Sequence, residues 1–269
     1  MGKRKSRLLR AALSALHYTG ADGLLAPFTS GDGVIFMLHH VKPGEATGFD
    51  PNGILKVTPE FLETVLEQVK SAGFDCIGLD DVPERLKSHN RPPFAVFTLD
   101  DGYKDNLAYA YPIFKKHGVP FTIYIPSSFA DGTGKLWWLE LEAVLTAAPS
   151  ITLEMKGKAQ TFALTSDAER QYAFDAIYWW LRAMPEAAAR AVTSGLLRDA
   201  GVDASRLCRD LVMSWDEIRM IASDPLVTIG AHTTNHYALA QLPEESARAE
   251  MAESLDRIAR ETGRPCRHF

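Results

Sequence analysis

Two adjacent carboxylates, Asp100 and Asp101, stand where the apolar run FAVFTL (94–99) ends and Gly102 begins a change of direction. Neighbouring like charges repel, and a bound cation would compensate for that repulsion. Adjacent side chains of a regular strand point to opposite faces, but Gly102 allows the backbone to leave strand geometry. One carboxylate could then bind a divalent ion while the other acts as a general base toward a water. This division of roles is our first hypothesis for the segment.

A second group of chemically useful residues is the pair His232 and His236, which follows the apolar run VTIGA (227–231). A spacing of four on a helical turn places both imidazoles on one side, where they can chelate one ion. Two histidines and one carboxylate form a common site for catalytic Zn²⁺ and related metals, with a position left open for water. An Asp-Asp-Gly alone is often only a turn, so the predicted metal site rests on the combination. We expect Zn²⁺, with Co²⁺, Ni²⁺ or Fe²⁺ as alternatives.

A third pair, His39 and His40, follows the apolar run VIFML (34–38). In parallel α/β folds the carboxyl ends of the strands share one face, and active sites collect there. Three runs that deliver His and Asp to the same face therefore support each other. His39 and His40 either line this site or are ordinary core or surface histidines, and the sequence leaves both interpretations open.

Two pairs of tryptophans could stack on sugar rings, although aromatic pairs more often pack a core. Trp137 and Trp138 are the better candidates for substrate contact, and Trp179 and Trp180 are weaker ones.

The elements that would position these residues are short apolar runs too short for buried helices and suited to strands covered on both faces. They are VIFML (34–38), FDCIGL (74–79, the weakest), FAVFTL (94–99), FTIYI (121–125) and VTIGA (227–231). Helical patterns separate them, and this alternation predicts parallel strands with helical crossovers in a barrel or an open sheet.

The helical patterns carry their own start and stop signals. Residues 58–73 begin with Thr58 and a proline and end at a glycine. Residues 105–118 begin with Asp105 as the expected N-cap and contain Pro112, which predicts a kink or an early break. Residues 214–223 open with the capping box of Ser214 and Glu217. A further helix is expected over 243–263.

The stretch 131–212 interrupts the alternation of strands and helices, and we interpret it as a largely helical insertion that includes a hairpin. The predicted organisation is an N-terminal basic amphipathic helix over 1–30, followed by one α/β domain over 31–269. The basic residues of the first segment allow a peripheral membrane contact, although a solvated tail is the simpler interpretation.

Composition excludes several classes of protein. The 269 residues are 46% hydrophobic and carry a formal net charge of -5, which argues against a general nucleic-acid binder. The three cysteines are scattered and show no CxxC spacing, so neither a disulfide framework nor a thiolate zinc site is indicated. We find no convincing signal peptide and no apolar run that would span a bilayer, and therefore expect a cytoplasmic location.

At these motifs a resemblance appears. FTLDDGYKDN (97–106) resembles the first motif of the polysaccharide deacetylase family, also called the NodB-homology or carbohydrate esterase 4 family. HTTNH (232–236) is similar to the family's second motif, and FMLHHV (36–41) and FTIYIPSSF (121–129) are similar to its strand segments. The resemblance covers about residues 34–269, with 131–212 matching poorly. It implies a distorted (β/α) barrel and metal-dependent removal of acetyl groups from N-acetylated sugars.

The resemblance also implies residue roles. Asp100 matches the family's general base and Asp101 its carboxylate ligand, while His232 and His236 match the other two metal ligands. The family's later motifs, including a Leu-x-His that supplies the general acid, are absent, because this sequence stops at GRPCRHF (263–269). We therefore expect the last barrel strands to be missing.

Without that Leu-x-His motif, another residue would have to protonate the leaving amine. His39, His40 or His268 could substitute as the acid, and the sequence does not choose among them.

The sequence predicts a deacetylase of oligo- or polysaccharides that contain N-acetylglucosamine, of the chitooligosaccharide deacetylase type of nodulation protein B. Two alternatives stay open. One is a hydrolase of non-sugar amides on the same barrel. The other is a non-catalytic saccharide-binding protein that kept the metal and lost the acid.

Overall fold

The computed structural model describes residues 3–21, 23–24, 31–44, 48–87 and 91–269, and its centre is a parallel five-stranded sheet. The strands are β1 (Gly33–Leu38), β4 (Asp75–Cys76), β5 (Phe94–Leu99), β6 (Phe121–Ile125) and β9 (Val227–Ala231). The hydrogen-bonded order is β1-β5-β6-β9, and β4 pairs with the first residues of β5. The predicted runs all contain strands, and the weakest run, 74–79, forms a strand of only two residues. The prediction that both faces of each strand are covered is wrong for β1, because Ile35 and Met37 on one face of it are exposed.

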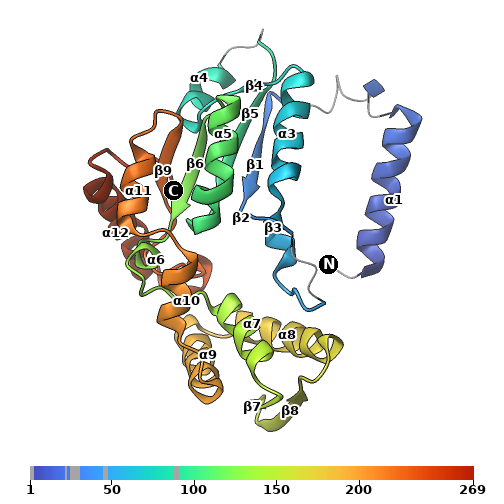
Figure 1. The fold of residues 1–269 in the computed structure, drawn as a ribbon, viewed down its shortest axis with the longest axis vertical. Helices are drawn as coiled ribbons and strands as arrows, with labels where there is room; N and C mark the ends of the chain where they lie inside the picture. The colour runs from blue at the N-terminus through green and yellow to red at the C-terminus, as the bar shows by residue number, and fades with distance from the viewer. Residues whose placement is uncertain (1–2, 22, 25–30, 45–47, 88–90) are drawn as a thin grey trace.

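Strand β5 is the centre of the core. All six of its residues are buried, because neighbouring strands pair with both of its edges and other elements cover its faces. Helices α3 (Pro59–Ser71), α5 (Tyr111–His117) and α11 (Trp215–Ala222) lie against one face of the sheet (Figure 1). Phe97 of β5 packs there against Phe36 and Phe114. This packing fixes where β5 ends and therefore where the two carboxylates emerge.

The predicted helix signals act as expected at two helices. The Thr58 hydroxyl accepts a hydrogen bond of 3.1 Å from the backbone N–H of Phe61 at the start of α3. Ser214 and Glu217 form the capping box of α11. The last long helix, α12 (Glu244–Thr262), covers the predicted range 243–263.

The helix after β5 differs from the prediction in one respect. Asn106–Ala110 (η3) is a turn of π-helix, and α5 follows with Pro112 near its start, so the predicted break is confirmed. The prediction of Asp105 as a helix cap is wrong, because its carboxylate makes no capping bond. It instead accepts hydrogen bonds from the His40 ring and the backbone N–H of Val41.

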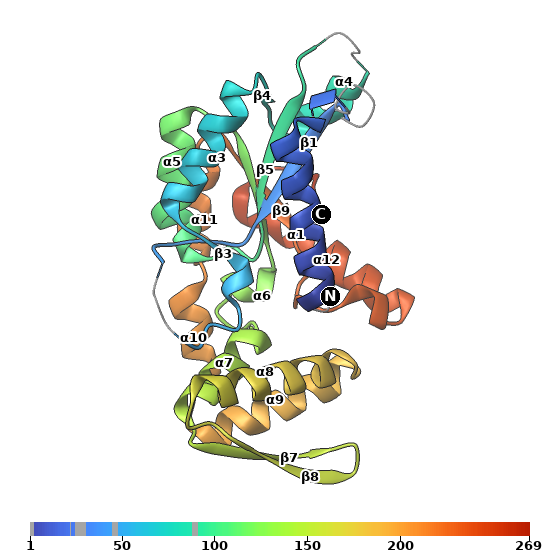
Figure 2. The same ribbon diagram turned by 90° about the vertical axis from the view of Figure 1, so that its right-hand side faces the viewer.

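Residues 127–211, between β6 and α11, form a second layer, most of which packs around its own hydrophobic cluster. Its elements are α6 (Ser127–Ala130), α7 (Trp137–Ala147), β7 (Ser150–Met155), β8 (Lys158–Ala163), α8 (Asp167–Arg182), α9 (Glu186–Ala200) and α10 (Ala204–Leu211). The predicted hairpin is β7–β8, whose turn residues Lys156 and Gly157 both have positive φ, as a tight hairpin turn requires. Figure 2 shows this hairpin at the end of the molecule farthest from the sheet.

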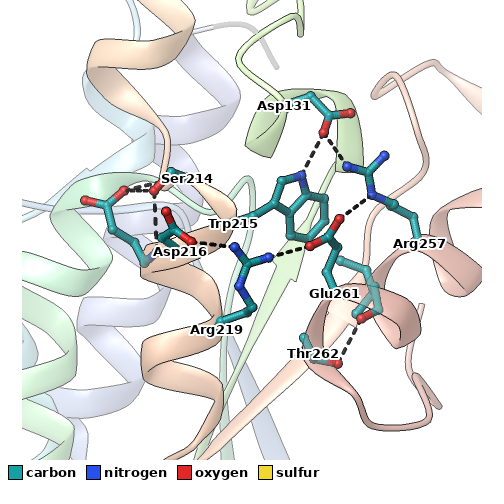
Figure 3. A network of polar contacts seen from close by, with 10 residues as sticks. Asp131, Ser214, Trp215, Asp216, Arg219, Arg257, Glu261 and Thr262 are labelled. Carbon is teal, nitrogen blue, oxygen red and sulfur yellow. Dashed lines mark hydrogen bonds and ion pairs between the residues drawn. The ribbon is translucent and has the colours of Figure 1, made fainter.

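A network of polar side chains joins the start of this segment to the helices beside the sheet (Figure 3). The Asp131 carboxylate accepts hydrogen bonds of 2.7 Å from both Trp215 of α11 and Arg257 of α12. Glu261 of α12 pairs with Arg257 and also with Arg219 of α11. The chain therefore leaves the sheet for the helical layer at a fixed point.

The predicted barrel is not confirmed, because the described strands form an open sheet whose hydrogen-bonded path ends at β1 and β9. Beyond β9 the last residues contribute a single backbone hydrogen bond, from Ala231 N–H to the His268 carbonyl at 2.9 Å. The short strands β2 (His40–Val41) and β3 (Lys56–Val57) pair separately. The parallel sheet with helical crossovers is consistent with part of a (β/α) barrel.

The remaining elements are peripheral. They are α1 (Lys3–Thr19), α4 (Val82–Leu86) and the short 3₁₀ turns η1 (Gly53–Leu55), η2 (Leu79–Asp81) and η4 (Leu239–Gln241). Helix α1 leaves the leucines Leu8, Leu9, Leu13 and Leu16 exposed. None of the described helices combines the length and the apolar composition that crossing a bilayer requires.

Candidate metal centre

Both carboxylates of the Asp-Asp pair reach the same site because the backbone turns left-handed directly after β5. Asp101 has φ 72° and Gly102 has φ 66°. A side chain at Gly102 would place its Cβ 2.5 Å from Cδ1 of Ile125, so both the conformation and the space favour glycine. Asp100 remains tied to the sheet through its N–H, which donates to the Leu38 carbonyl at 2.9 Å. The turn at Asp101 resolves the problem that a regular strand would point the two carboxylates apart.

Three side chains from two distant parts of the sequence converge at this edge of the sheet. The Asp101 Oδ1 atom lies 3.2 Å from His236 Nε2 and 3.8 Å from His232 Nε2. All three potential ligand atoms lie within 4.8 Å of one another. In a tetrahedral zinc site with bonds of 2.0–2.1 Å, neighbouring ligand atoms are about 3.3 Å apart. The predicted convergence of Asp101 with both histidines is therefore present.

One of the three candidate ligands, Asp101, has a buried oxygen atom without a hydrogen-bond donor among the described residues, and this also fits a bound cation. Asp101 is almost completely buried, and its Oδ1 accepts no well-directed hydrogen bond from any described residue. Buried carboxylate oxygens normally have a partner, and a bound ion would provide one. A second cluster of possible ligands, Glu63, Glu67 and His117, is less suitable because Lys116 already neutralises Glu63.

The histidine motif does not form the helical turn that the spacing of four suggested. Residues 232–237 are an irregular loop in which Thr233 and His236 have φ 66° and 58°. The His236 N–H donates to the Thr233 hydroxyl at 2.7 Å, and this bond stabilises the sharp turn. The two imidazole rings still approach each other, with centroids 5.0 Å apart. The histidines converge because the loop folds back on itself.

Two helices hold this loop in place, α9, which precedes it in the sequence, and α12, which follows it. Glu250 of α12 accepts hydrogen bonds from the backbone N–H groups of Thr234 and Asn235, at 3.0 and 2.7 Å. Arg190 of α9 donates to the Asn235 carbonyl at 2.9 Å and is itself paired with Glu186. These contacts could not be predicted from the sequence, because charged residues on helices are usually solvated.

The ionisation of the site suits metal binding. Burial, and secondarily the neighbouring His236, lower the pKa of His232 to about 4, so this ring is neutral at pH 7 as a metal ligand must be. Burial alone would raise the pKa of Asp101, but the contact with His236 outweighs it and lowers that pKa below its ordinary value. Burial and the adjacent Asp101 charge raise the pKa of Asp100 to about 7. The two carboxylates thus have different proton affinities, as a ligand and a base require.

The two histidines after β1 have different surroundings. His39 lines the cavity in front of the metal centre, and its Nε2 lies 4.0 Å from Asp100 Oδ2. His40 is buried, stacks on Tyr103 at 3.6 Å and binds Asp105 through Nδ1 at 2.6 Å. Among the described residues that line the cavity, His39 is present and His40 is not. His40 therefore supports the site through its contacts with Tyr103 and Asp105 and does not face the substrate.

The third histidine considered as an acid, His268, lies elsewhere. Its Nε2 is 2.9 Å from Asp80 Oδ1, and it does not line the cavity formed by the described residues.

An open cavity of about 420 Å³ lies in front of the metal centre, between the sheet edge and the helical layer. Trp137 and Trp138 both line it, in an edge-to-face arrangement with centroids 6.0 Å apart. Trp138 is mostly buried and packs 4.9 Å from the His236 ring. The sequence prediction gave little weight to Trp179, which also lines this cavity. No local pattern distinguishes this exposed tryptophan from an ordinary residue on a helix.

The match to known proteins is consistent with this geometry. Residues 87–269 match the polysaccharide deacetylase family, and because this match covers more than half of the chain, the protein belongs to that family. No curated protein matches the chain at a significant level.

Two solved structures share the fold. One is a Streptococcus pyogenes deacetylase, PplD, in complex with acetate, with 15% identity and a TM-score of 0.52 over 87% of this chain and 70% of that one. The other is IcaB from Ammonifex degensii, with 15% identity and a TM-score of 0.50 over 88% of this chain and 72% of that one. At this identity the likeness concerns the fold alone.

Proposed function

We propose that this chain is a divalent-metal-dependent hydrolase that removes N-acetyl groups from oligo- or polysaccharides containing N-acetylglucosamine. The observation that carries the proposal is the convergence of Asp101, His232 and His236 beside a second, unliganded carboxylate, Asp100. Membership of the polysaccharide deacetylase family supports the class of substrate. We further propose that residues 31–269 form one catalytic domain with 131–212 as its insertion, preceded by a separate segment over 1–30.

Asp101, His232 and His236 would hold the metal, and we expect Zn²⁺, with Co²⁺, Ni²⁺ or Fe²⁺ as alternatives. A divalent ion there would supply positive charge to polarise the acyl oxygen and acidify a water. The remaining tasks fall to the protein's own residues. They must accept the proton of the attacking water, orient the sugar and protonate the amine that leaves.

Asp100 is suited to accept the proton. Its carboxylate sits beside the metal ligands without joining them, and its raised pKa makes it a better base than an ordinary aspartate. The leaving amine must receive a proton, because an amide anion is a very poor leaving group. Of the three histidines considered, His39 alone lines the cavity and approaches Asp100. We assign the protonation of the leaving amine to Asp100 and His39 acting together: the proton is the one that Asp100 accepts from the attacking water, and His39 is the neighbouring group in the cavity.

The direct test is incubation of the Zn²⁺-loaded chain with N-acetylglucosamine oligomers, followed by quantification of acetate and of free amines. We expect equal amounts of both products. Asp100→Asn is the control, since it removes the base and retains the three metal-binding residues. Normal metal content without release of acetate from any acetylated sugar would contradict the proposal and favour a saccharide-binding protein. Turnover of small non-sugar amides in place of sugars would favour the other alternative.

A further inference from the structure

We propose that Trp179 of α8, with Tyr178 and Trp137, forms a second saccharide subsite beside the metal centre, so that the chain prefers an oligosaccharide over a single sugar. This inference rests on the proposed function and names the residue that recognises a neighbouring sugar ring.

Trp179 is exposed in a way that packing does not explain. The residue is 66% exposed, whereas the adjacent Trp180 packs against the hydrophobic cluster of the helical layer. Exposure of a large aromatic ring forfeits the stabilisation that burial would give. Trp179 also lines the same cavity as Asp101 and His236. A ring that faces this cavity is available to a bound ligand.

A continuous series of aromatic rings joins the metal centre to Trp179. The ring centroids of His236 and Trp138 are 4.9 Å apart, and those of Trp138 and Trp137 are 6.0 Å apart. The centroids of the Trp137 and Tyr178 rings are 5.0 Å apart, and those of Tyr178 and Trp179 are 5.3 Å apart. The series forms one wall of the cavity, and a ligand with several rings would contact it along its length.

The same face of α8 also presents groups that bind hydroxyls. Asp175 lies four residues before Trp179 and Arg182 three residues after it, so the helix places all three on one side. Each of them lines the cavity. Aromatic faces combined with a few charged groups are suited to sugars, whose rings have apolar faces and hydroxyl edges.

The size of the cavity agrees with more than one sugar ring. Its volume of about 420 Å³ lies within the range of roughly 300–1,000 Å³ that is usual for sites of drug-sized ligands. Only one acetyl group needs to reach the ligands Asp101 and His236, and Trp179 lies at the other end of the aromatic wall. The rest of the cavity is therefore available to the neighbouring part of a chain.

The test compares Trp179→Ala with Tyr172→Ala, which removes an equally exposed aromatic ring from the same helix outside this cavity. The KM and kcat for acetate release are measured with N-acetylglucosamine and with its pentamer. We expect Trp179→Ala to raise the KM for the pentamer about fivefold and to change the KM for the monomer much less, because only the longer chain reaches the subsite. Trp179→Phe should restore most of the affinity, and Tyr172→Ala should behave as the wild type.

Binding and catalysis are separated by calorimetric titration of the pentamer into Asp100→Asn and into Asp100→Asn with Trp179→Ala. Weaker binding of the pentamer in the double variant supports the subsite, whether or not the wild type releases acetate. Absence of acetate release by the wild type would contradict only the proposed function. Equal pentamer kinetics in Trp179→Ala and Tyr172→Ala, with an active wild type, would overturn the subsite. A fivefold loss that is identical for the monomer and the pentamer would also overturn it.

Discussion

Glu250 and Asn235 are joined by two hydrogen bonds, one from the Asn235 backbone N–H at 2.7 Å and one from its Nδ2 at 2.6 Å. Asn235 immediately precedes the candidate ligand His236, and Glu250 is buried on α12. The carboxylate therefore replaces water for a loop whose backbone adopts left-handed conformations at two positions. This contact couples a helix outside the motif to the orientation of a metal ligand.

We expect Glu250→Ala to weaken binding of Zn²⁺ by about 10- to 100-fold, the range usual for residues that orient metal ligands. Loss of the carboxylate leaves the N–H groups of Thr234 and Asn235 without an acceptor, and the loop can leave the geometry that brings His236 to Asp101. Competition with a chromophoric chelator measures this affinity. Glu253→Ala, at an exposed position of the same helix, is the control. Wild-type Zn²⁺ affinity in Glu250→Ala would show that the loop holds its shape without the carboxylate.

We expect Asp100→Asn to lower kcat for deacetylation by about 10²- to 10⁴-fold, the range that general base catalysis supplies. The amide is nearly isosteric but cannot accept the proton of the attacking water. The metal content should stay near one ion per chain, because Asp101, His232 and His236 are intact. Acetate release and elemental analysis on the same sample check both parts. A kcat close to that of the wild type would exclude Asp100 as the base.

We expect His232→Ala and His236→Ala each to reduce the Zn²⁺ content after dialysis against a weak chelator. Either change leaves two of the three ligands, and three protein ligands are usual in catalytic zinc sites. His117→Ala is a suitable control, since its ring belongs to the surface cluster with Glu63. Full Zn²⁺ content in both site variants would mean that the ion binds elsewhere.

We expect the Asp100 carboxyl group of the metal-free protein to titrate near pH 7. Burial and the Asp101 charge disfavour its ionised form, so it stays protonated between its ordinary pKa of 3.8 and about 7. Addition of Zn²⁺ should lower this pKa, because a cation nearby favours the carboxylate. Carbon-13 NMR of labelled aspartate, with Asp100→Asn to assign the signal, follows both titrations. An Asp100 signal with an ordinary pKa in the metal-free protein would contradict the burial argument.

The sequence by itself predicted the strands, the starts of helices α3 and α11 and the side chains that meet at the end of the sheet. The apolar runs 94–99 and 227–231 form strands, of which the first is fully buried and the second partly buried. Thr58 and Ser214 cap their helices. These features depend on local periodicity and on hydrogen bonds between near neighbours. The rule that parallel strands end on one face was sufficient to bring Asp101 and the two histidines together.

Only the tertiary structure decided how those residues are held and what surrounds them. The loop of His236 is not helical, Asp105 binds His40 instead of capping a helix, and Glu250 supports Asn235. Each of these depends on contacts between residues that local pattern does not relate, and a buried carboxylate or an exposed tryptophan such as Trp179 has the same sequence signature as an ordinary helix residue. Burial, charge pairing and cavity position arise only when separate elements pack, so they could not be read from the sequence.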